Sequence, residues 1–263
     1  MQRIAALLSA AFILPALAGF NYPECPDYMP SEFRYRKLIS RLSDPTLREP
    51  VRMDFDYRGE GRTDIYFAER HGKIKRWDAV KNEMTVLGEL EVFSDDSTRP
   101  DAEGSETGIN GLALDPDFKE NQRLYVFYSP YRDTVYRLSR FTLKDGKMDM
   151  GSEKILLDIP EGRRHVSAIT IGGGAMEWDA DGNLYIAVGA NSEQFPSVDE
   201  RIRKRSAEAS SANMADLRGA ILRIHPDESE KGYSVPKGNL AEYWAAELEK
   251  DGRSALARTY ADT

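Results

Sequence analysis

The sequence predicts an all-β fold, a β-propeller of four-stranded antiparallel blades with about three to four blades present. Three segments follow one order: a short apolar strand, an acidic or Gly-rich turn, a second apolar strand, and a further strand ending in a polar turn. If Asp56, Asp115 and Asp179 are equivalent positions, the repeats lie 59 and 64 residues apart. Blades arranged radially produce repeats of this kind, here longer than the ~40–50 residues of the familiar propeller repeats.

The strands are read from short apolar runs bounded by turn residues. The first repeat spans 51–56, 64–69 and 72–78, and the second spans 111–118, 123–129 and 136–143. The third runs from Gly172 to the turn at Asp179 and continues through 184–189 and 220–224. Trp77 and Trp178 fall on these strands, so we expect both to pack between blades.

A tight hairpin turn is predicted at 179–183, Asp-Ala-Asp-Gly-Asn. Glycine tolerates positive φ there, and Asp and Asn bond to their own backbone. The same residues resemble the start of a calcium loop, but that pattern requires Gly at position six and Glu at position twelve. Here Gly182 stands at four and Ala190 at twelve, so the turn is the preferred interpretation. The glycine triplet 172–174 precedes a strand, which argues against a nucleotide loop.

The N-terminus predicts a secretory signal over residues 1–18. One basic residue, Arg3, precedes the apolar run 4–14, and Ala16-Leu17-Ala18 supplies an A-x-A exit, so cleavage is expected near Ala18. The alternative is a buried N-terminal helix. The apolar run is shorter than the ~20 residues that a transmembrane helix requires. We therefore expect a secreted or periplasmic protein with no membrane span, an N-terminal extension at 19–31 and a propeller over 32–263.

The composition is that of an acidic globular protein, with 36 Lys and Arg against 44 Asp and Glu and a net charge of −8. This balance argues against a nucleic-acid partner, which would need a basic face. The local basic run 201–205 is interpreted as a solvated loop rather than a ligand patch. Cys25 is the single cysteine, so no disulfide can form within the chain.

An ordered set of motifs resembles the glucose/sorbosone dehydrogenase family, whose soluble six-bladed propellers use pyrroloquinoline quinone (PQQ). The stretches Ala68-Glu-Arg-His-Gly-Lys-Ile-Lys-Arg-Trp-Asp, Gly108-Ile-Asn-Gly-Leu-Ala-Leu-Asp-Pro-Asp-Phe and Asp216-Leu-Arg-Gly-Ala-Ile-Leu-Arg-Ile-His-Pro are similar to parts of three successive blades. Shorter matches at 124–129, 138–142 and 155–160 keep the expected order. The resemblance covers roughly residues 33–239 and implies the N-terminal half of such a ring.

An incomplete ring has consequences for partners and cofactors. Relative to six blades, it would leave long strand edges exposed, and these would allow association. The resemblance implies PQQ and calcium as cofactors, with a sugar-type small molecule as substrate. It places most of their ligands in later blades, beyond Thr263, so no metal ligand is assigned within this chain.

The resemblance also implies a catalytic histidine just before the glycines that open the third blade. A histidine suits this role because its ordinary pKa near 6.5 lets it accept a proton at neutral pH. The gapless match places Ile171 there, and isoleucine cannot accept a proton. His165 is the nearest histidine and the candidate base, if a short insertion has shifted the loop. The alternative is that His165 is an ordinary loop residue and the base is lost; His71 and His225 are weaker candidates.

Glu106 is the candidate cofactor-contacting residue, because the family carries a polar residue before the second-blade Gly-x-x-Gly strand. A carboxylate has the wrong charge for a polycarboxylate such as PQQ but could hold a cation; the alternative is an acidic turn residue. Two function hypotheses remain open. One is an exported PQQ-dependent sugar or aldose dehydrogenase, and the other is a secreted binding protein that kept the scaffold without the base.

Overall fold

The structure is a computed structural model that describes residues 38–40, 44–57, 63–94, 107–160, 172–190, 211, 216–240, 243, 246, 249–250 and 252. The chain divides into two compact units, 1–45 and 46–263. In the first unit, the Asp44 amide donates a hydrogen bond to the Ser40 carbonyl. Everything below concerns the second unit.

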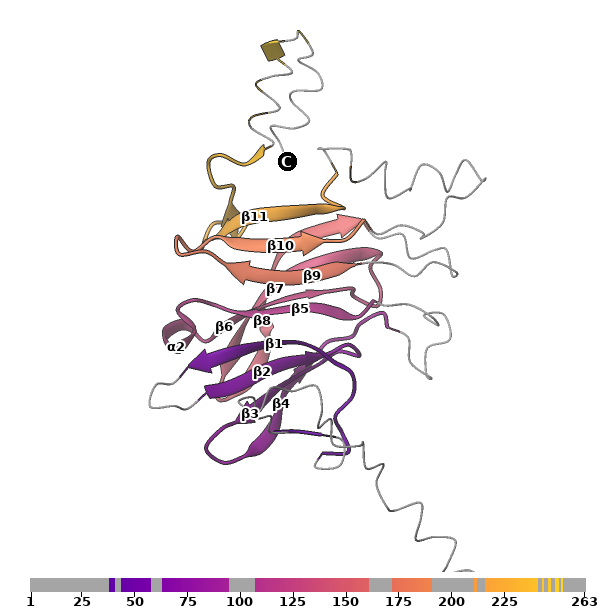
Figure 1. The fold of residues 1–263 in the computed structure, drawn as a ribbon, viewed down its shortest axis with the longest axis vertical. Coiled ribbons are helices and arrows are strands. Elements are labelled where there is room, and N and C mark those ends of the chain that lie inside the picture. Colours follow the sequence, from indigo (N-terminus) through magenta and orange to yellow (C-terminus); the bar gives the residue numbers. More distant parts are fainter. Residues whose placement is uncertain are drawn as a thin grey trace, which may run out of the picture. The chain divides into compact units, whose positions relative to one another are not determined.

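Three four-stranded antiparallel sheets follow one another along the chain (Figure 1). The first contains β1 (Pro50–Tyr57), β2 (Thr63–Glu69), β3 (Lys73–Asp78) and β4 (Glu83–Glu89). The second contains β5 (Ile109–Leu114), β6 (Arg123–Tyr128), β7 (Val135–Lys144) and β8 (Lys147–Pro160). The third contains β9 (Gly173–Trp178), β10 (Leu184–Val188), β11 (Ala220–Pro226) and β12 (Tyr233–Ser234). The predicted all-β fold with blades of a propeller is confirmed, and we call the sheets blades 1, 2 and 3.

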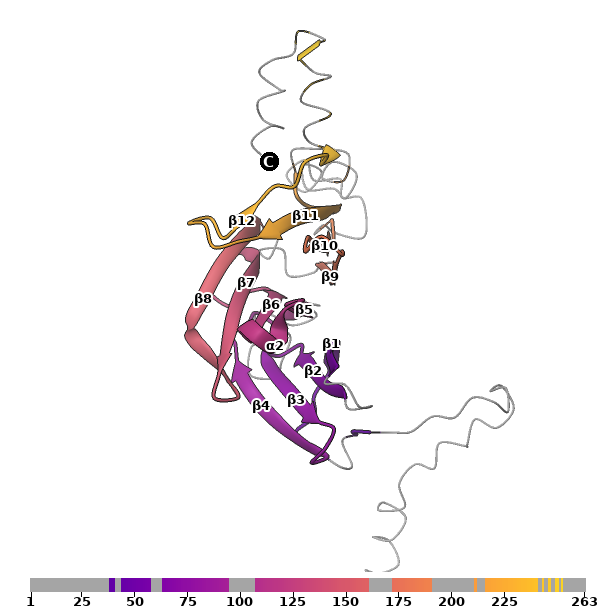
Figure 2. The ribbon, with the colours of Figure 1, turned by 90° about the vertical axis from the view of Figure 1, so that its left-hand side faces the viewer.

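Each blade pairs its strands in sequence order, so its first strand lies at one edge of the sheet. These first strands, β1, β5 and β9, lie along one side of the stack, and β4 and β8 lie along the other (Figure 2). Asp115 and Asp179 directly follow β5 and β9, and Asp56 is the last but one residue of β1. The three aspartates therefore mark the same corner of each blade, as the repeat spacing predicted.

The core lies between the blades, because each sheet buries side chains on both faces. We call the face toward the preceding blade the backward face and the face toward the following blade the forward face. Blades 1 and 2 share one apolar cluster, with Tyr66, Ala68 and Ile74 from the forward face of blade 1. Blades 2 and 3 share a second cluster, with Tyr125, Phe127 and Leu138 from the forward face of blade 2. Side chains alternate along each strand, so one blade contributes to both clusters.

Two details differ from the sequence-based expectations. The turn after Asp115 contains a one-turn helix, α2 (Phe118–Asn121), whose Phe118 is buried in the first cluster. Trp178 packs between blades 2 and 3, edge-on to Tyr125 at a centroid distance of 5.1 Å. Trp77 pairs with Ile65 on the opposite face of blade 1, away from blade 2, so the expectation holds for Trp178 only.

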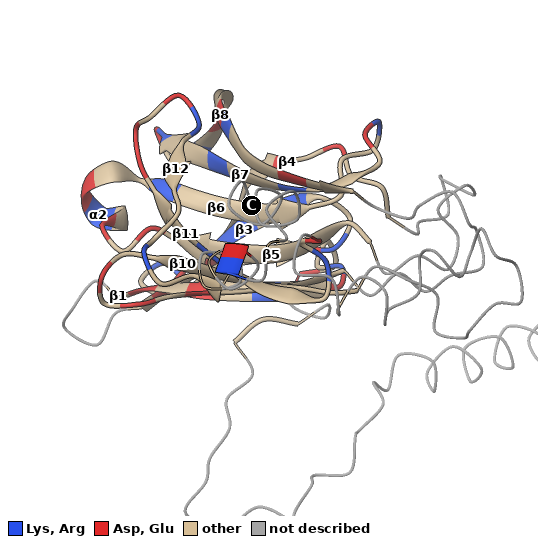
Figure 3. Cartoon of the chain, turned by 90° about the horizontal axis from the view of Figure 1, so that it is seen from above, with Lys and Arg blue, Asp and Glu red and all other residues tan. Residues whose placement is uncertain are grey.

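The described surface carries both charge signs, with acidic and basic residues interspersed over the strands and turns (Figure 3). Among the described residues, no helix is long and apolar enough to cross a membrane.

Candidate functional site

The residues that the family resemblance singles out, Glu106, His165 and Ile171, lie outside the described residues. Thr107 and Gly172, which directly follow Glu106 and Ile171, are described, and they lead into β5 and β9. The candidate site is therefore the end of the blades at which β5 and β9 begin. We call it the loop end.

The start of β5 is fixed by hydrogen bonds to the segment after β4 and to the turn between β2 and β3. Thr107 is fully buried, and its hydroxyl donates a 2.6 Å hydrogen bond to the Phe93 carbonyl. The Ile109 amide donates to the Arg70 carbonyl at 2.9 Å. Gly108 has a φ of +120, and a Cβ there would lie 2.1 Å from the Arg70 carbonyl oxygen. Residues 107–109, which follow Glu106, are therefore held in place by hydrogen bonds and close packing.

The glycine triplet 172–174 permits close approach of the first strands of blades 2 and 3. A Cβ on Gly174 would lie 2.5 Å from the Asn110 carbonyl oxygen, and one on Gly111 would lie 2.4 Å from the Gly174 oxygen. A Cβ on Gly172 would likewise lie 2.5 Å from the Tyr136 hydroxyl oxygen. The glycines are needed for packing of β9 on β5, which agrees with the prediction that they are not a nucleotide loop.

A polar cluster sits beside this contact. The Arg70 guanidinium donates to the Glu49 carboxylate at 2.6 Å, and this hydrogen bond holds the pKa of Glu49 below its ordinary value. His71 lies 3.6 Å from the same carboxylate through Nε2, and its Nδ1 lies 3.1 Å from the Ser94 hydroxyl. Ser94 is buried. His71 is thus in the predicted turn, but both of its ring nitrogens face polar neighbours that orient it.

Three arginines of the loop end are paired with carboxylates, whereas Arg52 on β1 has a buried Nε without a hydrogen-bond partner. Arg70 binds Glu49, and Arg218 binds Asp216 at 2.5 Å, which lowers the pKa of that carboxyl through its side-chain hydrogen bond. Arg137 makes two 2.8 Å bonds to Asp158, and these raise the pKa of the guanidinium further. Arg132 lies 4.0 Å from Glu91.

The arginine–carboxylate ion pairs bear on whether these arginines could bind PQQ. A polycarboxylate is bound best by arginines whose donors are free to form bidentate contacts. Arg70, Arg137 and Arg218 are held by carboxylates and do not offer such a clamp, and no contact with PQQ is assigned to a described residue. The described residues also contain no group of three His, Cys, Asp or Glu side chains that could hold a metal ion.

At the opposite end of the blades, the same Asn–Asp side-chain hydrogen bond occurs in blades 2 and 3. The Asn121 amide donates to the Asp115 carboxylate at 2.8 Å, and the Asn183 amide donates to the Asp179 carboxylate at 2.9 Å. This confirms the predicted hairpin turn at 179–183. His225 lies here, with its Nδ1 3.2 Å from the Asn183 side-chain oxygen. The two weaker histidine candidates therefore sit at opposite ends of the blades.

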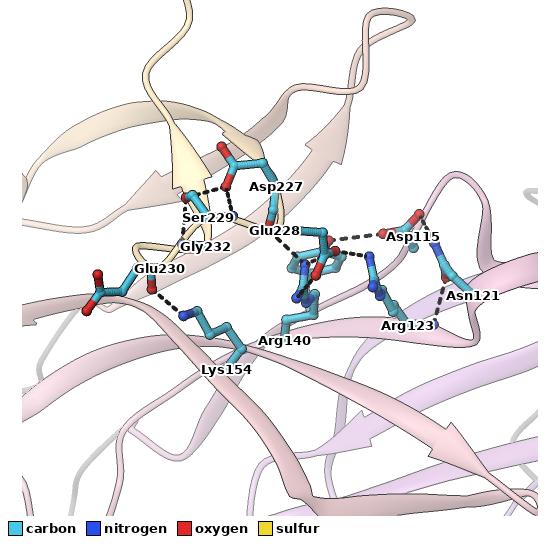
Figure 4. Close-up of polar contacts among 11 residues, drawn as sticks. Asp115, Asn121, Arg123, Arg140, Lys154, Asp227, Glu228, Ser229, Glu230 and Gly232 are labelled. Carbon is cyan, nitrogen blue, oxygen red and sulfur yellow. Dashed lines mark hydrogen bonds and ion pairs between the residues drawn. The ribbon is translucent and has the colours of Figure 1, made fainter.

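Sequence reasoning missed the ionic contact between blades 2 and 3 at this opposite end (Figure 4). Glu228, in the turn between β11 and β12, pairs with Arg123 at 2.6 Å and with Arg140 at 3.2 Å. Arg140 also donates to the Asp227 carbonyl, and Lys154 donates to the Glu230 carbonyl. The partners are 76 to 105 residues apart, so no local pattern announces them. Every cation in the contact has a partner, which makes it a bond between blades and not a ligand site.

The fold defines the class: consecutive four-stranded blades of a β-propeller. The Glucose / Sorbosone dehydrogenase family model matches residues 47–242. The chain belongs to this family.

Among curated proteins, the hedgehog-interacting proteins of mouse and human are each 25% identical over 239 residues, which cover 81% of this chain and 31% of theirs. The chain thus spans about a third of the length of these relatives. Among solved structures, the PQQ-bound form of aldose sugar dehydrogenase from Streptomyces coelicolor is 23% identical with a TM-score of 0.50, over 73% of this chain and 47% of that one. A crystal structure of a glucose dehydrogenase is 21% identical with a TM-score of 0.50 over the same shares.

Proposed function

We propose that the chain is an exported protein of the PQQ-dependent sugar dehydrogenase kind that acts on the hydroxyl of a sugar-type small molecule. The observation that supports this most is the contact between β5 and β9. Thr107 and Gly172 lead into that contact, and the segments that carry Glu106 and His165 directly precede them. The family match over residues 47–242 includes both segments.

In this proposal His165 accepts the proton of the sugar hydroxyl, and Glu106 stands near the cofactor. The family's position for the base holds Ile171, which has no proton acceptor, so the proton must go to another group. His165 precedes the glycine triplet by seven residues. PQQ and calcium are proposed on family likeness alone, and no contact to either is assigned to a described residue. Their ligands would have to come from elsewhere.

Export is the second part of the proposal. It rests on residues 1–18 with the cleavage site near Ala18, followed by the extension 19–31 and the propeller over 32–263. Mass spectrometry of the secreted or periplasmic chain measures this directly: we expect a mature N-terminus close to residue 19. A chain that keeps residues 1–18 would contradict export by this route.

A non-catalytic binding protein is the second candidate, and two observations favour it. Ile171 stands where the family has its base, and Arg70, Arg137 and Arg218 of the loop end are paired with carboxylates. The curated relatives are named for an interaction with another protein rather than for a reaction. A propeller that lost its base could keep its fold and serve in binding.

A titration of the purified chain with PQQ and Ca²⁺ separates the two candidates. Thermal stability reports binding, because a ligand that binds only the folded state raises the melting temperature. Sugar-dependent dye reduction reports turnover. The dehydrogenase proposal predicts saturable stabilisation with turnover that His165→Ala abolishes, while the matched control His225→Ala keeps it. Stabilisation without turnover, or no response, would support the binding protein instead.

A further inference from the structure

The first strand of each blade begins at the loop end with one extra residue, a β-bulge. In β1 the register with β2 shifts by one residue between Pro50 and Arg52, and β5 and β9 shift in the same way. The three residues that directly follow the bulges occupy equivalent positions, and they are Arg52, Gly111 and Ala175. Bulges re-aim side chains and are frequent next to functional sites. The residue after the bulge is therefore a place where the chemistry of one blade can differ from that of the next.

Blades 2 and 3 have small residues at this position. A Cβ on Gly111 would lie 2.4 Å from the Gly174 carbonyl oxygen of the next blade, and blade 3 has Ala175. Blade 1 instead has Arg52, whose backbone pairs with Ala68. Because glycine and alanine complete the strand in the other two described blades, the strand itself does not require a long cationic side chain. The arginine therefore serves a purpose other than the pairing of β1 with β2.

The Arg52 guanidinium is bonded through one nitrogen and unpaired at the other two. Nη1 donates a 2.8 Å hydrogen bond to the carbonyl of Val51, the extra residue of the bulge. Nε is buried without a hydrogen-bond partner, while Nη2 donates to none of the described residues and is not buried. A guanidinium carries five N–H donors, so most of them lack an acceptor here. A buried donor without an acceptor is rare in folded proteins and calls for an explanation.

The carboxylates of the described chain do not compensate this charge. Within the described residues Arg52 forms no ion pair, whereas the Arg70 guanidinium at the same end lies 2.6 Å from a carboxylate. Asp54 is the next residue of β1 on the same face, and its two oxygens already accept backbone hydrogen bonds, from Leu114 and from Phe55. The loop end of blade 1 thus holds a positive charge whose counterion the described chain does not supply.

We propose that Arg52 binds the carboxylate of an acidic sugar at the loop end. A carboxylate presents two oxygens that match two N–H donors of a guanidinium, and such charge-assisted hydrogen bonds are about twice as strong as neutral ones. The buried Nε and the bond from Nη1 to Val51 hold the group in one orientation, so little side-chain freedom is lost when a ligand binds. The sugar in this assignment rests on the proposed function, while the carboxylate rests on Arg52 itself.

Calorimetric titration of the purified full chain tests the proposal without PQQ and without turnover. The probes are D-glucuronate and, as the uncharged sugar, D-glucose, and we expect glucuronate to bind more tightly. Arg52→Gln should raise the dissociation constant for glucuronate by at least about 10-fold and leave that for glucose unchanged, because it removes a charge-assisted hydrogen bond. Arg132→Gln is the matched control at the same end: its side chain is 84% exposed, so it should change neither constant by more than about 2-fold.

Arg52→Lys keeps the charge but loses the paired donors of the guanidinium. Its affinity for glucuronate should fall between those of the parent chain and Arg52→Gln. Circular dichroism verifies that each variant is folded, and Arg52→Lys replaces Arg52→Gln if that variant fails. Three results would overturn the proposal: no measurable binding of glucuronate, equal affinities for glucuronate and glucose, or an equal loss of affinity in Arg52→Gln and Arg132→Gln.

PQQ is also a carboxylate, so a titration with PQQ separates the two sources of this group. If Arg52→Gln weakens the binding of PQQ and leaves that of glucuronate unchanged, the arginine serves the cofactor and the acidic sugar is the wrong ligand. Binding of glucuronate that depends on Arg52, with no dye reduction, would support the acidic sugar and contradict only the dehydrogenase. Dye reduction with glucose in a chain that does not bind glucuronate would support the dehydrogenase and overturn the acidic sugar.

Discussion

The indole Nε1 of Trp178 donates a 2.7 Å hydrogen bond to the main-chain carbonyl of Leu114, across the boundary between blades 2 and 3. The amide of the same Leu114 donates to the Asp54 carboxylate of blade 1, also at 2.7 Å. One residue at the end of β5 therefore connects all three blades. Because β5 is the edge strand of blade 2, backbone groups that point away from β6 can bond to the neighbouring blades.

Trp178→Phe should lower the free energy of unfolding by about 1–3 kcal/mol, because it leaves the Leu114 carbonyl without its indole donor. Urea unfolding followed by fluorescence or circular dichroism measures the change. Tyr57→Phe is the control, because the position is exposed and the new ring can keep its contact with Phe55, so the midpoint should change little. An unchanged midpoint for Trp178→Phe would show that the bond does not join the blades energetically.

Gly174→Ala should destabilise the fold by more than about 2 kcal/mol. Its φ is +103, and the new Cβ would lie 2.5 Å from the Asn110 carbonyl oxygen, so β9 would be pushed off β5. Gly146→Ala is the matched control: its φ is +73, yet nothing lies within 4 Å of a Cβ there, so it should cost only about 1 kcal/mol. Equal losses for both variants would mean that the close approach of the strands is not needed.

Lys75→Met should destabilise the first blade by about 3–5 kcal/mol, since it removes one partner of a buried ion pair. Lys75 and Glu69 are 2.6 Å apart, with side-chain exposures of 0% and 2%. Adding Glu69→Gln should recover part of the loss, because the amide oxygen can still accept from the Arg48 amide without leaving a buried charge. If the double variant is less stable than Lys75→Met alone, the charge is not what makes the single change costly.

The ion pair of Asp216 and Arg218 makes stability depend on pH. The folded state lowers the pKa of the Asp216 carboxyl from its ordinary value of 3.8, so the stabilisation is complete above that value and is lost as the pH falls through the lower folded value. Arg218→Gln should therefore weaken the fold at about pH 6, and its difference from the parent chain should shrink toward about pH 2. Urea unfolding across this range tests it. A constant difference at every pH would contradict the role of the carboxylate.

The strands and the repeat were predictable because they depend on local pattern. Alternation of apolar residues and the Asp-Gly turn fix β9 and β10, and the triplet 172–174 was correctly separated from nucleotide loops. The helix α2 was missed because Phe118 is helical only as part of the core between blades 1 and 2. The contacts of Trp178 with Leu114 and of Glu228 with Arg140 join residues 64 and 88 apart, which no single-sequence pattern reports.

The candidate site was predicted less completely. The resemblance directed attention to the glycines before β9, and the structure shows why they are glycines. The paired arginines at the loop end and the orientation of His71 by Glu49 and Ser94 emerge only when separate turns meet in space. Glu106, His165 and Ile171 lie outside the described residues, so their assignments stay predictions.

The most direct test of the proposed function is a single-turnover experiment on the chain loaded with PQQ and Ca²⁺. Aldose sugar is mixed with the loaded chain without oxygen or dye, and the absorbance of the quinone is followed. We expect the bound quinone to become reduced in the parent chain and in His225→Ala, and to stay oxidised in His165→Ala. A quinone that remains bound and oxidised in the parent chain at saturating sugar would contradict a dehydrogenase and leave the binding protein.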